Sequence, residues 1–244
     1  MKRIPRIQIA GIKSPEEAQL CIDAGADGLG LLLMLDYPRG DAISVTQARA
    51  IADAVPESIC TVLITHSTAL DEIVASVRRA GVNTLQIHND SCNEMPLSRI
   101  ADIRQALPDI AIIKVLHIPA SVAGNSEYAC AQARALLPYV DALILDSQAT
   151  EHIDGRDYRT LGGTGCLNNW DIAGAIVSAV APCPVVHAGG LTPDNVYAAI
   201  AAIRPYGVDV NSGVRKNGFV DKDPQKVRAF VEQAKSAFAN TGTV

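Results

Sequence analysis

Short apolar runs and longer amphipathic stretches alternate along the whole chain. The short runs are apolar almost without interruption and rich in Val, Ile and Leu, which predicts parallel strands that are buried on both faces. We expect eight of them, over Arg6–Ile12, Gly28–Leu35, Ile59–Thr65, Thr84–His88, Ile110–Ile118, Ala142–Asp146, Pro184–Ala188 and Val208–Asn211.

The stretches between these strands carry helix signals. Ser14 precedes Pro15 and two glutamates, which is a typical helix start, because the serine hydroxyl caps the first turn and proline fits its first position. The expected helices are Pro15–Ala24, Thr46–Ala54, Ala69–Ala80, Pro96–Ala106, Glu127–Leu137, Asp171–Val180, Pro193–Ile203 and Pro224–Ala239.

Eight strand–helix units fit either an open doubly wound sheet or a closed barrel. Units of roughly thirty residues favour the barrel, and no G-x-G-x-x-G follows the first strand, which weakens a dinucleotide-binding interpretation. No Pro/Gly-rich linker or shift in composition divides the chain. We therefore expect an α/β protein with one (β/α)8 TIM barrel of parallel strands over residues 1–244. The segment Ser147 to Asn169 is expected to be an irregular loop at the active-site face.

Composition excludes several classes of function. The chain has 21 Lys and Arg against 26 Asp and Glu, and only 4% aromatic residues, which argues against a nucleic-acid partner. No apolar run is long enough to cross a membrane and no signal-peptide core follows the first residues, so we expect a cytoplasmic protein. Six scattered cysteines without C-x-x-C spacing predict buried thiols rather than disulfides or a zinc site. No metal or cofactor is expected.

Two glycine turns follow the last two predicted strands. The run "VVHAGGLTPDNV" contains Gly189 and Gly190, and "GVDVNSGV" contains Ser212 and Gly213. Glycines let backbone N–H groups approach an anion closely, and barrel enzymes bind phosphate with the loops after their last two strands. A single glycine more often serves only a tight turn, but recurrence at consecutive strands predicts a phosphate site.

Asp146 ends the apolar strand "DALILDSQ" at the expected barrel mouth. A carboxyl group partly removed from water favours its protonated form and can act as a general acid. The alternative is that Asp146 only caps the following loop. Gly163 and Thr164, in "LGGTG", add a further glycine-rich stretch that we assign to substrate binding, although alone it is a weak signal.

Together these motifs resemble the phosphoribosylanthranilate isomerase family, whose members are (β/α)8 enzymes of tryptophan biosynthesis. The resemblance implies an Amadori-type conversion of an aldose to a ketose on a phosphoribosyl amine, with Asp146 as general acid. It implies a phosphorylated small-molecule substrate, no nucleic-acid or membrane partner, and a monomer or homodimer. It rests on "AGIKSPEEA", "AGADGLGL", "LQIHND", "IIKVLHI", "LILDS", "GGTG", "NNW", "AGGLTPDNV", "RPYGVDVNSGV" and "KDPQKVRAFV".

The first strand departs from the family pattern. The family has Lys-Ile-Cys-Gly-Ile-Thr there, and its cysteine acts as general base. This chain has Gln8, Ala10 and Lys13 at the positions of the lysine, cysteine and threonine. A methyl group accepts no proton, so Ala10 marks the position of a missing base.

Several residues are candidates to replace that base. His66 follows the third strand and titrates near neutral pH, although a loop-capping histidine is the commoner case. Asp209 lies on the last strand and matches an aspartate of the family pattern. Cys166 is a further candidate, but a packing thiol is more usual there. Lys13 can form a Schiff base or bind a carboxylate, or it is simply solvated.

The resemblance also carries over substrate-binding positions. Arg39 roughly matches the arginine that binds the anthranilate carboxylate, and a surface arginine is the alternative. His88 and Lys114 match family positions on the fourth and fifth strands, and Asn211 stands where the family has a serine.

Three functions therefore stay open at this point. The first is a phosphoribosylanthranilate isomerase-like enzyme with a relocated base. The second is a non-catalytic or divergent barrel that binds a phosphosugar. The third is an aldolase or epimerase with changed substrate, using Lys13 or His66.

Overall fold

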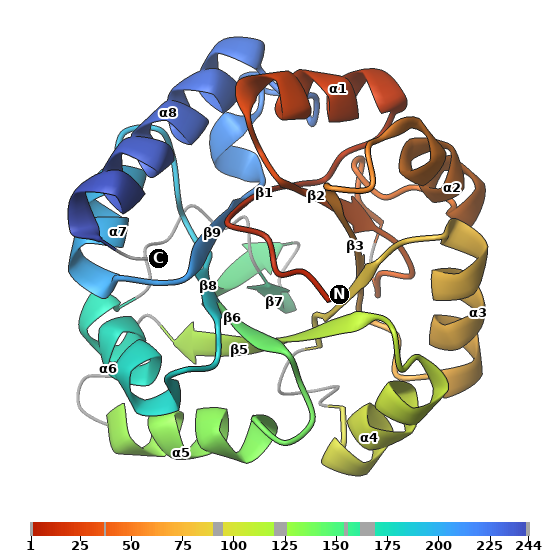
Figure 1. Cartoon of the computed structure of the whole chain (residues 1–244), viewed down its shortest axis with the longest axis horizontal. Helices are drawn as coiled ribbons and strands as arrows, with labels where there is room; N and C mark the ends of the chain where they lie inside the picture. Colours follow the sequence, from red (N-terminus) through yellow and green to blue (C-terminus); the bar gives the residue numbers. More distant parts are fainter. Residues whose placement is uncertain are drawn as a thin grey trace.

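The computed structural model describes residues 2–36, 38–89, 95–119, 126–153, 156–161 and 169–242. Within this part of the chain, eight parallel strands form a ring (Figure 1). Strand β1 pairs with β2 on one side and with β9 on the other, and the pairing of β5 with β6 closes the ring. The strands of the ring are β1 (Ile7–Ala10), β2 (Gly28–Leu32), β3 (Cys60–Thr65), β4 (Thr84–Ile87), β5 (Ala111–Pro119), β6 (Ala142–Ile153), β8 (Val185–His187) and β9 (Gly207–Val210).

Helices surround the ring on its outer side (Figure 1). The predicted start of the first helix is confirmed, because the Ser14 hydroxyl accepts a hydrogen bond from the backbone N–H of Glu17 and Pro15 occupies the first turn. The described helices are α1 (Pro15–Ala24), α2 (Val45–Ala54), α3 (Leu70–Ala80), α4 (Leu97–Ala106), α5 (Ser126–Leu136), α6 (Trp170–Val180), α7 (Val196–Ile203) and α8 (Pro224–Thr241), with the short 3-10 helix η1 (Ser212–Val214) after β9.

The apolar core has two shells, as expected for strands buried on both faces. The larger shell lies between the strands and the helices, where Ile9, Leu63 and Phe230 are fully buried. The inner shell fills the ring, with one cluster around Val62 and another around Ile144. This arrangement confirms the predicted (β/α)8 TIM barrel.

One prediction about the chain path is wrong. Residues 147–153 and 156–161 are not irregular, because β6 continues past Asp146 to Ile153 and pairs antiparallel with β7 (Arg156–Leu161). Residues 162–168 of the expected loop lie outside the described residues. The two strands are separated in sequence only by Asp154-Gly155, a dipeptide that is typical of two-residue hairpins. That dipeptide is a local hairpin signal that the prediction of a loop did not use.

Further predictions concern cysteines and membranes. Cys21, Cys60 and Cys130 are buried free thiols and Cys183 is partly buried, as expected. Cys92 and Cys166 lie outside the described residues. No helix in the described ranges combines the length and the apolar character needed to cross a bilayer.

Candidate active site

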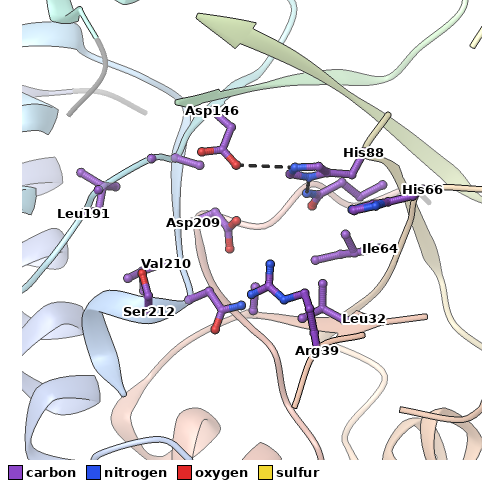
Figure 2. Close-up of a pocket in the computed structure, with 16 residues that line it drawn as sticks. Leu32, Arg39, Ile64, His66, His88, Asp146, Leu191, Asp209, Val210 and Ser212 are labelled. Atoms are coloured by element: carbon purple, nitrogen blue, oxygen red, sulfur yellow. Dashed lines mark hydrogen bonds and ion pairs between the residues drawn. The ribbon is translucent and has the colours of Figure 1, made fainter. Parts of the chain in front are cut away.

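A pocket opens at the carboxyl ends of the barrel strands (Figure 2). It joins residues that are far apart in the sequence, because the carboxyl ends of parallel strands meet at one end of the ring. Gly213 follows the pocket-lining residue Ser212 in η1. Gly163 and Thr164 lie outside the described residues. The predicted site residues that line the pocket are Ala10, Arg39, His66, His88, Asp146, Gly189, Gly190, Asp209 and Ser212.

The two glycine turns pack backbone against backbone. Gly189 and Gly190 both have positive φ, 90° and 66°, which glycine adopts without strain. A Cβ at Gly213 would lie 1.9 Å from the carbonyl oxygen of Leu191, so only glycine allows this approach. Asn195 holds the first turn, since its Nδ2 donates to the carbonyl of Gly190 at 2.9 Å. The result is a rigid pair of glycine turns at one wall of the pocket.

A chain of polar side chains extends from the barrel interior to the wall of the pocket. Gln8 donates from Nε2 to Oε1 of Gln86 at 3.0 Å, and Gln86 Nε2 lies 3.3 Å from Nδ1 of His88. Because an amide nitrogen can only donate, Nδ1 of His88 accepts and the ring proton is on Nε2. That Nε2 lies 3.7 Å from Oδ2 of Asp146, as drawn in Figure 2.

His88 is a neutral group in this site. Burial, followed by the nearby charges of His117, His66, Lys114 and Arg39, holds the pKa of His88 well below its usual value. Its ring stacks on His66 with centroids 5.7 Å apart and meets the edge of His117 at 5.3 Å. His88 can therefore present an N–H toward Asp146 without adding a positive charge.

Asp209 lies on β9, beside Gln8 of β1 in the strand register. The residue is 9% exposed, and its Oδ1 has no hydrogen-bond partner among the described residues. Burial, followed by the negative charge of Asp146, raises the pKa of Asp209 to about 7, against the opposing effects of a hydrogen bond from Gln8 and the charge of Lys222. This carboxyl group can take up or release a proton near neutral pH.

Arg39 is fixed at the pocket wall by Asp41. Its Nε donates to Oδ1 of Asp41 at 3.0 Å and its NH2 group donates to Oδ2 at 3.2 Å. Asp41 also accepts from Asn211 at 2.9 Å and pairs with Arg215. Burial alone would raise the pKa of Asp41, but these donors and cations outweigh it and hold the value at about 2. The guanidinium is thus positioned by a permanently ionised carboxylate.

A buried lysine supports the rim of the pocket from behind. Nζ of Lys222 donates to Oδ1 of Asn211 at 2.8 Å. Burial, followed by the positive charge of Arg215, lowers the pKa of Lys222 to about 8, although Asp41 and Glu17 oppose this effect. Asn211, which precedes Ser212, is therefore held between Lys222 and Asp41.

Two candidate replacement bases have partners of their own. Lys13 pairs with Asp221 and is not among the residues that line the pocket, so the structure does not favour a Schiff base there. His66 does line the pocket, but its Nδ1 lies 3.4 Å from the backbone N–H of Asp36 and 3.5 Å from the Asp36 carboxylate.

Sequence reasoning missed four residues of the site: Asp41, Gln86, Arg215 and Lys222. Asp41 and Arg215 are 174 positions apart, and no local pattern marks either of them. Gln86 could have been suspected, because it is a polar residue in an otherwise apolar strand. Residues two apart in a strand face the same side of the sheet, so Gln86 shares the side of His88.

Comparison with known proteins gives consistent results. A family profile described as N-(5'phosphoribosyl)anthranilate (PRA) isomerase matches residues 7–233. The chain is 36% identical over 239 residues to N-(5'-phosphoribosyl)anthranilate isomerase 2 of Methanosarcina mazei, which covers 96% of this chain and 95% of that protein. It is 35% identical over 234 residues to the isomerase of Haloferax volcanii, with 95% and 94% coverage.

Two solved structures are similar over nearly the whole chain. Phosphoribosyl anthranilate isomerase from Thermotoga maritima has a TM-score of 0.75 at 26% identity, covering 96% of this chain and 100% of that chain. A phosphoribosyl anthranilate isomerase in complex with reduced 1-(o-carboxyphenylamino)-1-deoxyribulose 5-phosphate has a TM-score of 0.71 at 25% identity, again with 96% and 100% coverage.

Proposed function

This chain belongs to the N-(5'-phosphoribosyl)anthranilate isomerase family, and from that premise we propose that it isomerises N-(5'-phosphoribosyl)anthranilate by an Amadori rearrangement with Asp146 as general acid. The observation that carries the proposal is the pocket itself. One cavity contains a buried carboxyl group, an immobilised arginine and two glycine turns. These are the groups required by a substrate with a sugar ring, a carboxylate and a phosphate.

The substrate groups have matching partners at opposite sides of the pocket. The turns at Gly189-Gly190 and Ser212-Gly213 offer backbone N–H groups to the phosphate, and no side chain intervenes at the glycines. Arg39, held by Asp41, faces the pocket as a planar cation suited to the anthranilate carboxylate. A related isomerase binds a reduced carboxyphenylamino-deoxyribulose phosphate, which carries the same two anionic groups.

The acid step follows from the position of Asp146. Its carboxyl group protonates the furanose ring oxygen, the bond between C1 and that oxygen breaks with its electron pair on the oxygen, and the amine nitrogen forms an iminium double bond to C1. Asp146 is 5% exposed, and the neutral His88 offers its Nε2–H from 3.7 Å once the carboxylate has formed. A positioned acid of this kind contributes about 10²–10⁴-fold in rate.

A second function has one specific observation in its favour. The family pattern places its base at residue 10, and Ala10 accepts no proton. If no other residue removes the proton from C2, the protein binds the phosphosugar but does not convert it.

A steady-state assay with N-(5'-phosphoribosyl)anthranilate separates the two functions. We expect turnover by the native chain, loss of about 10²–10⁴-fold in kcat for Asp146→Asn, and little change in the affinity for the reduced product analogue. Rescue of an isomerase-deficient tryptophan auxotroph by the native chain, but not by Asp146→Asn, checks the same point in cells. Tight binding of the analogue with no turnover contradicts the proposed activity and supports the second function, a phosphosugar-binding protein without catalysis.

Membership of the family also bears on the partners and location of this protein. A phosphorylated ligand is present in a related isomerase structure, and the described helices include none that could span a membrane. We infer the cytoplasm as the site of action and a monomer or homodimer as the assembly, and size-exclusion chromatography with light scattering tests the latter.

A further inference from the structure

We propose that Asp209 is the general base of this chain and takes the role that the cysteine at position 10 has in the family pattern. This inference rests on the proposed isomerisation and identifies the group that completes it. The first observation is placement. Asp209 lines the same pocket as Ala10 and Asp146, and β9, which carries it, is the hydrogen-bonded neighbour of β1, which carries Ala10. Figure 2 shows Asp209 in the space between Asp146 and Arg39.

The second observation is an unsatisfied oxygen. Asp209 is 9% exposed, and its Oδ1 has no hydrogen-bond partner among the described residues. Burying a carboxylate oxygen without a donor costs free energy, so native proteins keep such oxygens at functional sites or satisfy them. Asp209 lines the pocket, so we infer that its carboxyl group, with one oxygen lacking a donor, accepts the proton from carbon when substrate is bound.

The third observation is the neighbour on β1. Gln8 is the register partner of Asp209 and donates a hydrogen bond to its carboxylate, while the family pattern has a lysine at this position. An ammonium group beside Asp209 would hold it ionised with a low pKa and make it a weak base. The neutral amide of Gln8 leaves the carboxylate more basic. Loss of the thiol at position 10 and loss of the cation at position 8 therefore have a common consequence: the proton acceptor moves from β1 to β9.

The charged groups around Asp209 make it a stronger base once it is ionised. The negative charge of Asp146 on β6 raises its pKa, and Lys222, in the segment before α8, lowers it. Arg39 lines the same pocket, whereas His88 is neutral for the reasons given above. Two carboxyl groups in one buried pocket titrate as a pair, and the proposed reaction starts from the singly protonated form that has its proton on Asp146.

The reaction then balances within this pair. Asp146 gives its proton to the ring oxygen and becomes a carboxylate. Asp209 takes the proton from C2, the C–H electron pair forms the C1–C2 double bond, and the electrons of the iminium bond return to nitrogen. The enolamine becomes the ketone by moving one proton from the C2 hydroxyl to C1. The pair ends with its single proton on Asp209 and is reset by exchange with water.

His66 is the competing candidate in the pocket. It follows β3, which is separated from β1 by β2, and its Nδ1 already faces the backbone N–H and carboxylate of Asp36. Asp209 therefore lies nearer to the position of the missing thiol in the order of strands and has an oxygen available for the proton.

The test moves the base back to β1. We expect Asp209→Asn to lower kcat by about 10²–10⁴-fold, with KM and the affinity for reduced 1-(o-carboxyphenylamino)-1-deoxyribulose 5-phosphate nearly unchanged. Ala10→Cys in the Asp209→Asn background should raise kcat at least about tenfold above that of Asp209→Asn alone, because a thiolate again faces C2. Ala10→Ser is the matched control, since a hydroxyl of similar size is too weak a base to rescue the variant. With C2-deuterated substrate, the isotope effect on kcat should increase in Asp209→Asn.

Three outcomes contradict the assignment. Native turnover that persists in Asp209→Asn shows that the isomerase activity stands but its base is another residue, and loss in His66→Gln alone then identifies His66. Rescue of Asp146→Asn, rather than Asp209→Asn, by Ala10→Cys reverses the roles of the two carboxyl groups. Absence of turnover in the native chain overturns the proposed function and this base together.

Discussion

Arg39 and Asp41 form a two-pronged contact at the mouth of the barrel, with nitrogen–oxygen distances of 3.0 and 3.2 Å. Asp41 is only 1% exposed and also binds Asn211 and Arg215, which belong to the segment after β9. Gly11 makes this packing possible, because a Cβ there would lie 2.7 Å from Oδ2 of Asp41. One carboxylate thus connects the proposed carboxylate-binding arginine to the residue that precedes Ser212 of the proposed phosphate-binding turn.

Asp41→Asn should weaken substrate binding and destabilise the fold. Arg39 loses its orientation, so we expect KM to rise by about tenfold, equivalent to about 1.4 kcal/mol, with a smaller change in kcat. Loss of the partner of two partly buried guanidinium groups should reduce the free energy of unfolding by on the order of 2 kcal/mol. Urea unfolding and steady-state kinetics measure both effects. Asp53→Asn is the control, since its i,i+4 pair with Arg49 is exposed and should matter by less than about 0.5 kcal/mol.

The same pair predicts acid sensitivity. The pKa of Asp41 is about 2 in the fold and about 3.9 in an unfolded chain. Its stabilising contribution is therefore complete above pH 4 and is lost as the pH falls from 4 through 2. Unfolding monitored between pH 5 and 2 should show a shallower loss of stability in Asp41→Asn than in the native chain, and equal slopes would contradict this explanation.

Gln8 variants should move the acid side of the pH–rate profile in opposite directions. Gln8→Lys places a cation beside Asp209, lowers the pKa of that carboxyl, and shifts the acid limb of kcat to lower pH. Gln8→Met removes the hydrogen bond that lowers the pKa of Asp209 and shifts the limb to higher pH. Both limbs of the bell-shaped profile belong to the carboxyl pair rather than to one residue. Identical profiles for the two variants would exclude Asp209 from the rate-determining ionisation.

Gly213→Ala tests the proposed phosphate site. Its new methyl group would meet the carbonyl of Leu191, so the two glycine turns must separate. We expect a loss of about 1–3 kcal/mol in unfolding free energy from the overpacking and a loss of at least about tenfold in affinity for inorganic phosphate and for the product analogue. Gly174→Ala, in the middle of α6 with open space around it, should instead stabilise the chain by about 0.5–1 kcal/mol. Unchanged phosphate affinity in Gly213→Ala, measured by calorimetry, would place the anion elsewhere.

Two buried thiols predict a loss of stability at alkaline pH. Burial raises the pKa of Cys21 and of Cys60 to about 12, compared with about 8.5 in an unfolded chain. Between these values the folded state binds more protons, so stability falls with rising pH by about 1.4 kcal/mol per pH unit for each thiol. Lys222, with a pKa of about 8, opposes one thiol between pH 8 and about 10.4, because there the unfolded chain binds the additional proton.

Cys21→Ala should therefore flatten the decline of stability between pH 9 and 11. Chemical denaturation at a series of pH values measures the slope. Cys130→Ala is a buried cysteine variant at a different position and controls for the loss of the thiol itself. A slope that is the same in both variants and in the native chain would mean that ionisation of Cys21 is not coupled to unfolding.

The sequence by itself determined the barrel and the positions of the two glycine turns and of Asp146 at the ends of its strands, because each depends on local patterns. Continuous apolar runs between capped helices define the eight units, and the glycines at 189, 190 and 213 lie directly after strands whose ends must meet. The departure at Ala10 was equally visible, since it is a single position in a short motif. Even the missed hairpin of β6 and β7 had its local signal in Asp154-Gly155.

Only the tertiary structure decided which polar groups share a partner. Gln8 meets Gln86 across 78 positions and Asp41 meets Arg215 across 174, and side chains at such separations are joined by the closure of the ring, not by any neighbour in the chain. The protonation behaviour of Asp209 depends on the same closure, because burial and the charge of Asp146 both act through space. A carboxylate in the sequence is a candidate, and its surroundings in the folded barrel decide whether it is a base.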